Sequence, residues 1–262
     1  MRSHLADKKN LRSIPPYSML ALVYDKMMEH VNYRKWAKYI ALICKEEKVW
    51  KQGKLLDIGC GTGRFIKEIG RLGQVADGCD PSSDMLKSAL KKVPERTFYQ
   101  CGLPDLVEIP PQSYLIMTCL YDTFNYLMEE EAVVNGLNMV HQKLLPGGLF
   151  IFDLVSELHC RQYFQGYYDS EVLNNDYAYS RESFYHEEDK IQYNWIRIYT
   201  PEGIFEEEHK QRIYDFSYIH SLITEKTPFT LLHVYDEFSL EPLSPLSGRA
   251  HFILKKEGKE SN

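Results

Sequence analysis

Apolar positions in the first 155 residues follow two periods, and each period predicts a different kind of element. Between residues 17 and 50 they return every three or four positions, which predicts helices. Beyond residue 50, short apolar runs alternate with helical stretches, which indicates a parallel sheet with helices on both faces. Pro146-Gly147-Gly148 is expected to end the last of these helices. The strands are predicted at 54–59, at 74–80, at 96–102, from 114 onward and at 149–155.

From about residue 165 the pattern changes to long, aromatic and roughly alternating stretches. Three of them, separated by turn-like residues, predict consecutive antiparallel strands between about 165 and 213. A helix at 217–226 and two final strands follow. Residues 1–16 are polar and end in Pro-Pro, so a loose leader is expected there.

Composition and charge narrow the class of protein. The 262 residues carry a formal charge of −6, whereas a protein that holds nucleic acid by itself usually presents a basic face. Nucleic acid is therefore not the expected partner. The six cysteines form no CxxC pair, which favours free thiols in a reducing cytoplasm over a metal site. No apolar run approaches 18 residues, so neither export nor a membrane span is predicted.

Residues 55–63, LLDIGCGTG, carry the strongest chemical signal in the chain. A strand, a glycine turn and a helix place a ligand at a helix N-terminus, at the carboxyl edge of a parallel sheet. The spacing is GxGxG, which differs from the GxGxxG of nicotinamide sites. Asp80 ends the second predicted strand, at about the interval where dinucleotide folds place a ribose-binding acid. A second interpretation is that Asp80 caps the following helix.

The order Asp57-x-Gly59-x-Gly61-x-Gly63 resembles motif I of the class I S-adenosylmethionine-dependent methyltransferases, and GCDPSSDML at 78–86 resembles the next motif of that family. The resemblance implies S-adenosyl-L-methionine as cofactor and S-adenosyl-L-homocysteine as product. Asp80 would then bind both ribose hydroxyls, and Met85 would pack on the adenine. The adenine amino group has no clear partner: backbone groups of Cys101 and Gly102, or the later Asp105, are the alternatives. The full set of implied cofactor contacts is Tyr17, Tyr24, Asp57, Gly59, Cys60, Gly61, Gly63, Asp80, Pro81, Met85, Cys101, Gly102, Leu103, Cys119, Leu120 and Tyr121.

The resemblance covers most of the chain, and within the family the sequence is most similar to the methyltransferases of small amines and amino sugars. It implies an α/β, Rossmann-like, doubly wound fold with a seven-stranded, mostly parallel sheet, N-terminal lid helices and an antiparallel insertion. We predict one domain over residues 1–262. Its parts are a leader with lid helices at 1–50, a cofactor-binding core at 51–164, a substrate-side insertion at 165–213 and the end of the core sheet at 214–262.

Three residues are candidates for the methyl-acceptor side. Tyr126 follows the fourth strand, where amino-sugar relatives tend to carry a histidine, and it is either a substrate contact or a packed aromatic. His209 lies in a stretch that resembles E-x-H-x-Q-R of the relatives, and it is either a base or a sheet-face histidine. Arg212 could hold an acidic group of the substrate or pair with a neighbouring glutamate. Strand alternation puts His209 and Gln211 on one face and Arg212 on the other.

The predicted protein is a cytoplasmic methyltransferase that acts on a small molecule, with nitrogen favoured over oxygen. The alternatives are an RNA or protein methyltransferase and a non-catalytic module that binds the cofactor. No metal is expected. The edge of the antiparallel insertion leaves a homodimer open.

Overall fold

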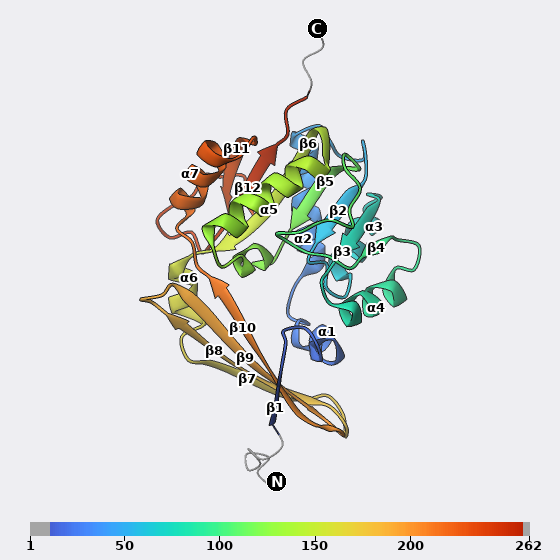
Figure 1. Ribbon diagram of the computed structural model, residues 1–262, viewed down its shortest axis with the longest axis vertical. Coiled ribbons are helices and arrows are strands. Elements are labelled where there is room, and N and C mark those ends of the chain that lie inside the picture. Colours follow the sequence, from blue (N-terminus) through green and yellow to red (C-terminus); the bar gives the residue numbers. More distant parts are fainter. Residues whose placement is uncertain (1–10, 259–262) are drawn as a thin grey trace.

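The computed structural model describes residues 11–258 and has two sheets (Figure 1). A seven-stranded sheet has the order β11-β12-β6-β5-β2-β3-β4. Neighbouring strands from β6 to β4 are parallel, and β12 runs antiparallel to both β6 and β11. The predicted α/β fold with a mostly parallel sheet is confirmed. The strands are β2 Leu55–Ile58, β3 Ala76–Cys79, β4 Phe98–Tyr99, β5 Tyr114–Cys119, β6 Leu144–Val155, β11 Thr230–Asp236 and β12 Arg249–Lys255.

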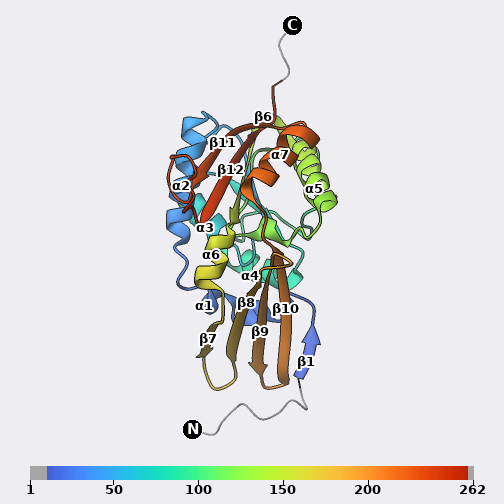
Figure 2. The ribbon, with the colours of Figure 1, turned by 90° about the vertical axis from the view of Figure 1, so that its left-hand side faces the viewer.

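Helices cover both faces of this sheet, because buried strand residues alternate between the faces. Leu55, Ile116 and Ile151 pack with one set of helices, whereas Leu56, Met117 and Phe150 pack with the other. The first set is α2 Tyr33–Glu46, α3 Arg64–Arg71 and α4 Ser83–Lys92; the second is α5 Glu130–Lys143 and α7 Phe216–Lys226. Figure 2 shows α2 and α5 on opposite sides of the sheet.

The antiparallel insertion forms a second sheet, which projects below the core in Figures 1 and 2. Its order is β1-β10-β9-β8-β7, and β1 pairs with β10 in parallel. The short helix α6 Glu157–Tyr163 joins the insertion to β6. The strands are β1 Leu11–Ile14, β7 Tyr167–Val172, β8 Ala178–His186, β9 Ile191–Thr200 and β10 Gly203–Arg212.

Three local predictions were wrong, and one helix was missed. Part of the expected leader is β1, because the free edge of β10 offers it a hydrogen-bonding partner; residues 1–10 lie outside the described part. The segment after Tyr17 contains only the 3-10 turn η2 Leu20–Leu22 and the short helix α1 Tyr24–Met27. Helix α5 ends at Lys143, before Pro146, because β6 already pairs with β5 through Leu144. The sequence pattern did not indicate α6.

No helix within residues 11–258 is long and apolar enough to cross a membrane.

Candidate cofactor and acceptor site

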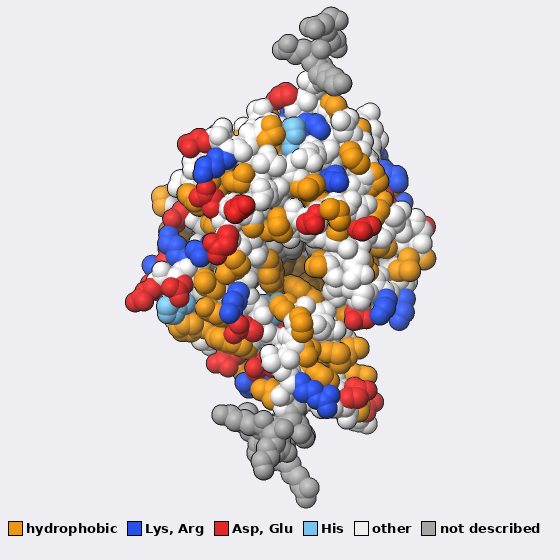
Figure 3. Space-filling view, in the orientation of Figure 1, with side chains coloured by type: hydrophobic (Ala, Val, Ile, Leu, Met, Phe, Trp, Pro, Cys, Tyr) orange, Lys and Arg blue, Asp and Glu red, His pale blue; other side chains and the backbone are white. Residues whose placement is uncertain are grey.

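A cavity of about 700 Å³ lies between the carboxyl ends of the core strands and the second sheet. That volume is within the usual range for small-molecule sites. Figure 3 shows a hollow on this face, bordered by hydrophobic side chains. Its lining comes from the core, from the lid segment at 16–33, and from α6 and β7 to β10 of the insertion. The core supplies the glycine turn, and the insertion supplies most of the polar groups at the opposite end.

The glycine turn has a shape that other residues cannot adopt without strain. Gly59 has a φ of 71°, and a Cβ there would lie 2.5 Å from Cγ2 of Thr123. Gly63 has a φ of 77° and caps α3, where a Cβ would meet Ala89 at 3.1 Å. Gly59 lines the cavity, whereas Gly63 does not. The two glycines are therefore needed for different reasons: Gly59 lets the backbone lie close to the cavity, and Gly63 lets α3 pack against α4.

Asp80 is only 6% exposed and is fixed by two backbone groups. Gly61 N donates to its Oδ2 and Ser82 N to its Oδ1, each at 2.9 Å. Burial raises the pKa of Asp80 to about 6. The N-cap of α4 is Ser82, whose Oγ accepts from Met85 N. Asp80 therefore does not cap that helix, and its carboxylate faces the cavity.

The cavity also contains a second buried acid, Asp57, whose surroundings bear on whether the expected cofactor fits. Thr118 Oγ1 donates to Asp57 at 2.7 Å, and burial raises the pKa of this carboxyl to about 7. Within the described residues, no Lys, Arg or His forms an ion pair with Asp57 or Asp80. Two buried carboxylates beside a glycine turn suit a ligand with hydroxyl or ammonium donors, because such donors stabilise their charge. The residues present therefore fit S-adenosylmethionine.

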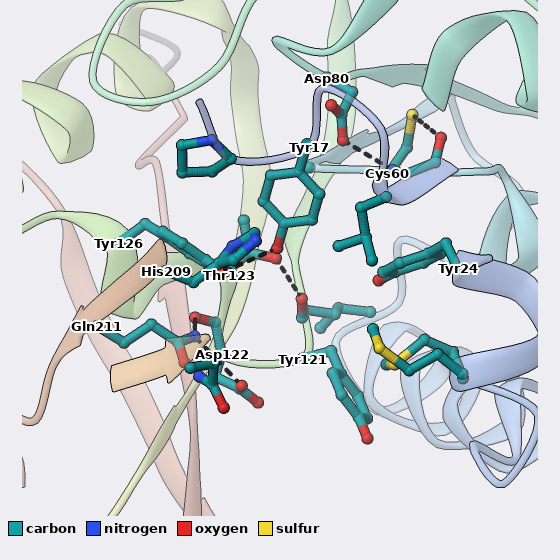
Figure 4. Close-up of a pocket in the computed structure, with 18 of the residues that line it drawn as sticks. Tyr17, Tyr24, Cys60, Asp80, Tyr121, Asp122, Thr123, Tyr126, His209 and Gln211 are labelled. Carbon is teal, nitrogen blue, oxygen red and sulfur yellow. Dashed lines mark hydrogen bonds between the residues drawn. The ribbon is translucent and has the colours of Figure 1, made fainter. Parts of the chain in front are cut away.

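Four polar side chains form a continuous chain beside the cavity, and Figure 4 shows three of them: Tyr17, Tyr126 and His209. Tyr17 Oη lies 2.8 Å from Tyr126 Oη, which lies 2.9 Å from His209 Nδ1. His209 Nε2 lies 3.1 Å from Glu207 Oε2. Because an ionised carboxylate only accepts, Nε2 carries the proton and Nδ1 accepts from Tyr126. The chain thus joins the lid, the turn η3 Thr123–Tyr126 and strand β10.

A charged cluster borders the acceptor end of the cavity. Arg249 donates to Asp153 and, at 2.8 Å, to Oδ1 of Asp122. Asp153 also accepts from the backbone N–H groups of Tyr121 and Asp122. Gln211 Nε2 donates to the carbonyl of Asp122 at 2.9 Å. Burial raises the pKa of Asp153 to about 6. With both carboxylates ionised, this cluster carries one more negative than positive charge; Asp122 and Arg249 line the cavity, whereas Asp153 lies behind them.

The insertion adds a partly open rim. Arg181 pairs with Asp169 at 3.0 Å and lies over the ring of Tyr167, while His159 packs against Tyr163. Burial lowers the pKa of His159 to about 4, so this ring is neutral near pH 7. Tyr163 is 59% exposed. The rim therefore presents aromatic faces, a neutral imidazole and the Arg181–Asp169 ion pair.

Most of the residues proposed from the sequence line this cavity, and five do not. The lining includes Tyr17, Tyr24, Asp57, Gly59, Cys60, Gly61, Asp80, Pro81, Gly102, Leu103, Leu120, Tyr121, Tyr126 and His209. Those outside the lining are Gly63, Met85, Cys101, Cys119 and Arg212.

The reasons are local. Met85 is fully buried in the core beside α3, so it does not present a face to an adenine here. Cys119 packs into the opposite core, because alternation along β5 turns its side chain away from the cavity, and Cys101, which follows β4, packs into the same core. Arg212 lies on the other face of β10 from His209. Its position therefore gives no support to substrate binding by Arg212, which stays a prediction. Asp105, the alternative adenine partner, does not line the cavity either.

Sequence reasoning missed Glu207, Asp122 and Arg249. Glu207 stands two residues before His209 on β10, so the alternation that placed Gln211 beside His209 could have found it too. Arg249 and Asp153 lie on paired strands far apart in the sequence, and no local signal joins them. All six cysteines are buried and free. No group of His, Cys, Asp and Glu within 11–258 is arranged to hold a metal ion.

Comparison with known proteins gives concordant matches. Residues 55–148 match the family described as "Methyltransferase domain". A protein of Geobacillus sp. (strain WCH70), provisionally named a methyltransferase, is 28% identical over 92% of this chain and 99% of its own length. A crystal structure of an S-adenosylmethionine-dependent methyltransferase from Clostridium acetobutylicum aligns with a TM-score of 0.76 and 23% identity over 91% of this chain and 98% of that one. The sugar N-methyltransferase KedS8 from Streptoalloteichus sp. aligns with a TM-score of 0.74 and 16% identity over 97% and 100% of the two chains. At these identities the two structures show a shared fold.

Proposed function

We propose that the methyl acceptor of this protein is a small molecule with a nucleophilic nitrogen. The protein is an S-adenosylmethionine-dependent methyltransferase with a Rossmann-like fold. The cofactor, when bound, supplies a methyl group on a sulfonium, which is already activated for transfer. The protein therefore has to align the acceptor, exclude water and accept a proton.

Cofactor binding is assigned to the glycine-turn end of the cavity. The Asp80 carboxylate would accept from the ribose hydroxyls, because its two oxygens face the cavity while backbone N–H groups hold it in place. Leu103 and Gly102 would border the adenine, and Tyr24 and Leu120 would border the sulfur end. Asp57 would balance the ammonium group of the methionine part.

The single observation that carries the choice of nitrogen is the negative charge at the acceptor end. Asp122 and Asp153 share one guanidinium, so the surroundings favour a cation over an acid. A protonated amine would bind there, but it must lose a proton before it can attack. The chain of Tyr17, Tyr126 and His209 offers a route: each hydroxyl takes a proton from one side and passes one to the next, and Nδ1 accepts the last. The fold shared with a sugar N-methyltransferase is consistent with this acceptor.

The size and charge of the protein support a small acceptor. The cavity of about 700 Å³ has to hold both ligands, and the chain carries a net charge of −6. An RNA acceptor would need a basic surface for its phosphates.

Methyl transfer to fractionated extract tests this function. With S-adenosylmethionine labelled on the methyl group, we expect label in the small-molecule fraction of a metabolite extract, and not in purified tRNA or lysate proteins. Label in tRNA or protein instead would favour the macromolecular alternative. Cofactor binding with no label in any fraction would favour a non-catalytic binding module.

Cofactor affinity should fall as the pH drops through about 6. The charged form of Asp80 prevails above its pKa of about 6, and protonation below it removes charge-assisted bonds worth roughly 1.5–3 kcal/mol each. Calorimetry with S-adenosylhomocysteine between pH 8 and 5 should show a plateau followed by weaker binding. Asp80→Asn should bind weakly throughout and lose the part of this dependence that lies near pH 6, keeping only the part near pH 7 that comes from Asp57. An unchanged wild-type affinity at pH 5 would contradict the assignment.

A further inference from the structure

We propose that Glu207 holds the lid closed, and we call it the latch of the lid. Its carboxylate binds the backbone of residues 17–20 over the cavity, so closing the lid also brings Tyr17 into the hydrogen-bonded chain with Tyr126 and His209. Glu207 is thereby a positioning residue, which acts through the lid and through His209. The inference extends the proposed function, but its test measures the lid directly and needs no methyl acceptor.

The carboxylate of Glu207 is fully buried and accepts from the lid backbone. Tyr17 N donates to Oε2 at 2.6 Å, while Met19 N and Leu20 N donate to Oε1 at 2.8 and 2.9 Å. His209 Nε2 donates a fourth bond. Within the described residues, no Lys or Arg pairs with this acid. A buried carboxylate is costly unless its oxygens are satisfied. Three of its four donors leave when the lid leaves, so the acid itself favours the closed lid.

A second bond ties the same segment to the cofactor end of the cavity. Ser82 Oγ donates to the carbonyl of Tyr17 at 2.8 Å, and Ser82 N donates to Asp80. Tyr17 has a left-handed φ of 61°, an uncommon conformation for a tyrosine. The lid therefore bridges β10 and α4, and Tyr17 stands between the two ligand regions. Figure 4 shows its ring reaching from the Asp80 side toward Tyr126 and His209.

Strand β10 organises this end of the site by alternation. Glu207, His209 and Gln211 share one face, and each holds a different segment: the lid, the turn η3 and the loop at Asp122. This arrangement explains the E-x-H-x-Q spacing as three successive attachments. It also fixes the proton on His209 Nε2, because Glu207 can only accept.

Hydrogen exchange of the lid tests the latch. We expect the amides of Tyr17, Met19 and Leu20 to exchange roughly tenfold faster or more in Glu207→Ala, since each loses a bond to a charged acceptor. Glu208→Ala is the matched control: its side chain is on the opposite face, bonded to Lys210 and Trp195, and lid exchange should not change. Peptides of β6 and β12 report whether the core remains folded. Release of S-adenosylhomocysteine should also be faster in Glu207→Ala.

Two further variants keep the test decisive if Glu207→Ala does not fold. Glu207→Gln keeps the shape, but only one of its two end groups can accept, so lid exchange should still rise. Ser82→Ala loosens the other attachment without touching β10 and should raise exchange at Tyr17 less. Lid exchange equal to the wild type in Glu207→Gln, with the core intact, would overturn the proposal. Such a result would leave the methyl-transfer proposal standing, because transfer to an extract is measured separately.

Discussion

Replacement of Asp80 by alanine is expected to weaken binding of S-adenosylhomocysteine by about 100-fold or more. The ribose would lose two bonds to a charged acceptor, and each such bond contributes roughly 1.5–3 kcal/mol. The change also releases Gly61 N and Ser82 N, which hold the glycine turn and the start of α4. The loss should therefore exceed that of a single ligand contact.

Calorimetry can separate this effect from a loss of fold. Asp84→Ala is the control, because Asp84 is a half-exposed residue of α4 that pairs only with Lys87 among the described residues. It should bind S-adenosylhomocysteine like the wild type. Wild-type affinity in a folded Asp80→Ala protein would show that the ribose is held elsewhere.

Removal of the His209 ring should lower kcat by about 10²–10³ at neutral pH while cofactor affinity changes little. His209 would be the final proton acceptor of the chain, and general-base catalysis typically contributes this much. Burial raises the pKa of Tyr126 well above its usual range, so its phenol cannot act as the base alone. Tyr126→Phe should show a similar loss, because it breaks the chain one step earlier.

The pH profile distinguishes a proton acceptor from a packing residue. At high pH the amine acceptor is already neutral in solution, so the activity of His209→Ala should recover toward that of the wild type. A purely structural defect would not recover. His220→Ala, an exposed histidine on α7, is the control and should have no effect. If kcat of His209→Ala at neutral pH equalled that of the wild type, the hydrogen-bonded chain of Tyr17, Tyr126 and His209 would have no part in proton transfer.

The sequence predicted the core well because its signals are local. Strand, turn and helix around Gly59 and Gly61 depend on backbone conformations that few other residues can adopt. Alternation along β10 likewise predicted from the sequence alone that His209 and Gln211 share one face of the strand. The lid was less predictable: its apolar spacing resembled a long helix, but Glu207, some 190 residues away, binds its amides.

The acceptor end was the least predictable part. Asp122, Asp153 and Arg249 come from three separate stretches, and pairing of β12 with β6 brings them together. Met85 and Arg212 show another limit of sequence reasoning: a motif match picks out a residue but does not say where its side chain points. The division of the chain into functional parts and the homodimer remain predictions.

Identification of the methylated product tests the central claim most directly. The purified protein is incubated with S-adenosylmethionine labelled on the methyl group and a metabolite extract, and labelled products are separated and analysed by mass spectrometry. The account predicts a small product that carries the methyl on nitrogen, formed in proportion to S-adenosylhomocysteine and absent with Asp80→Ala. A label found on oxygen, or only in macromolecules, would contradict it.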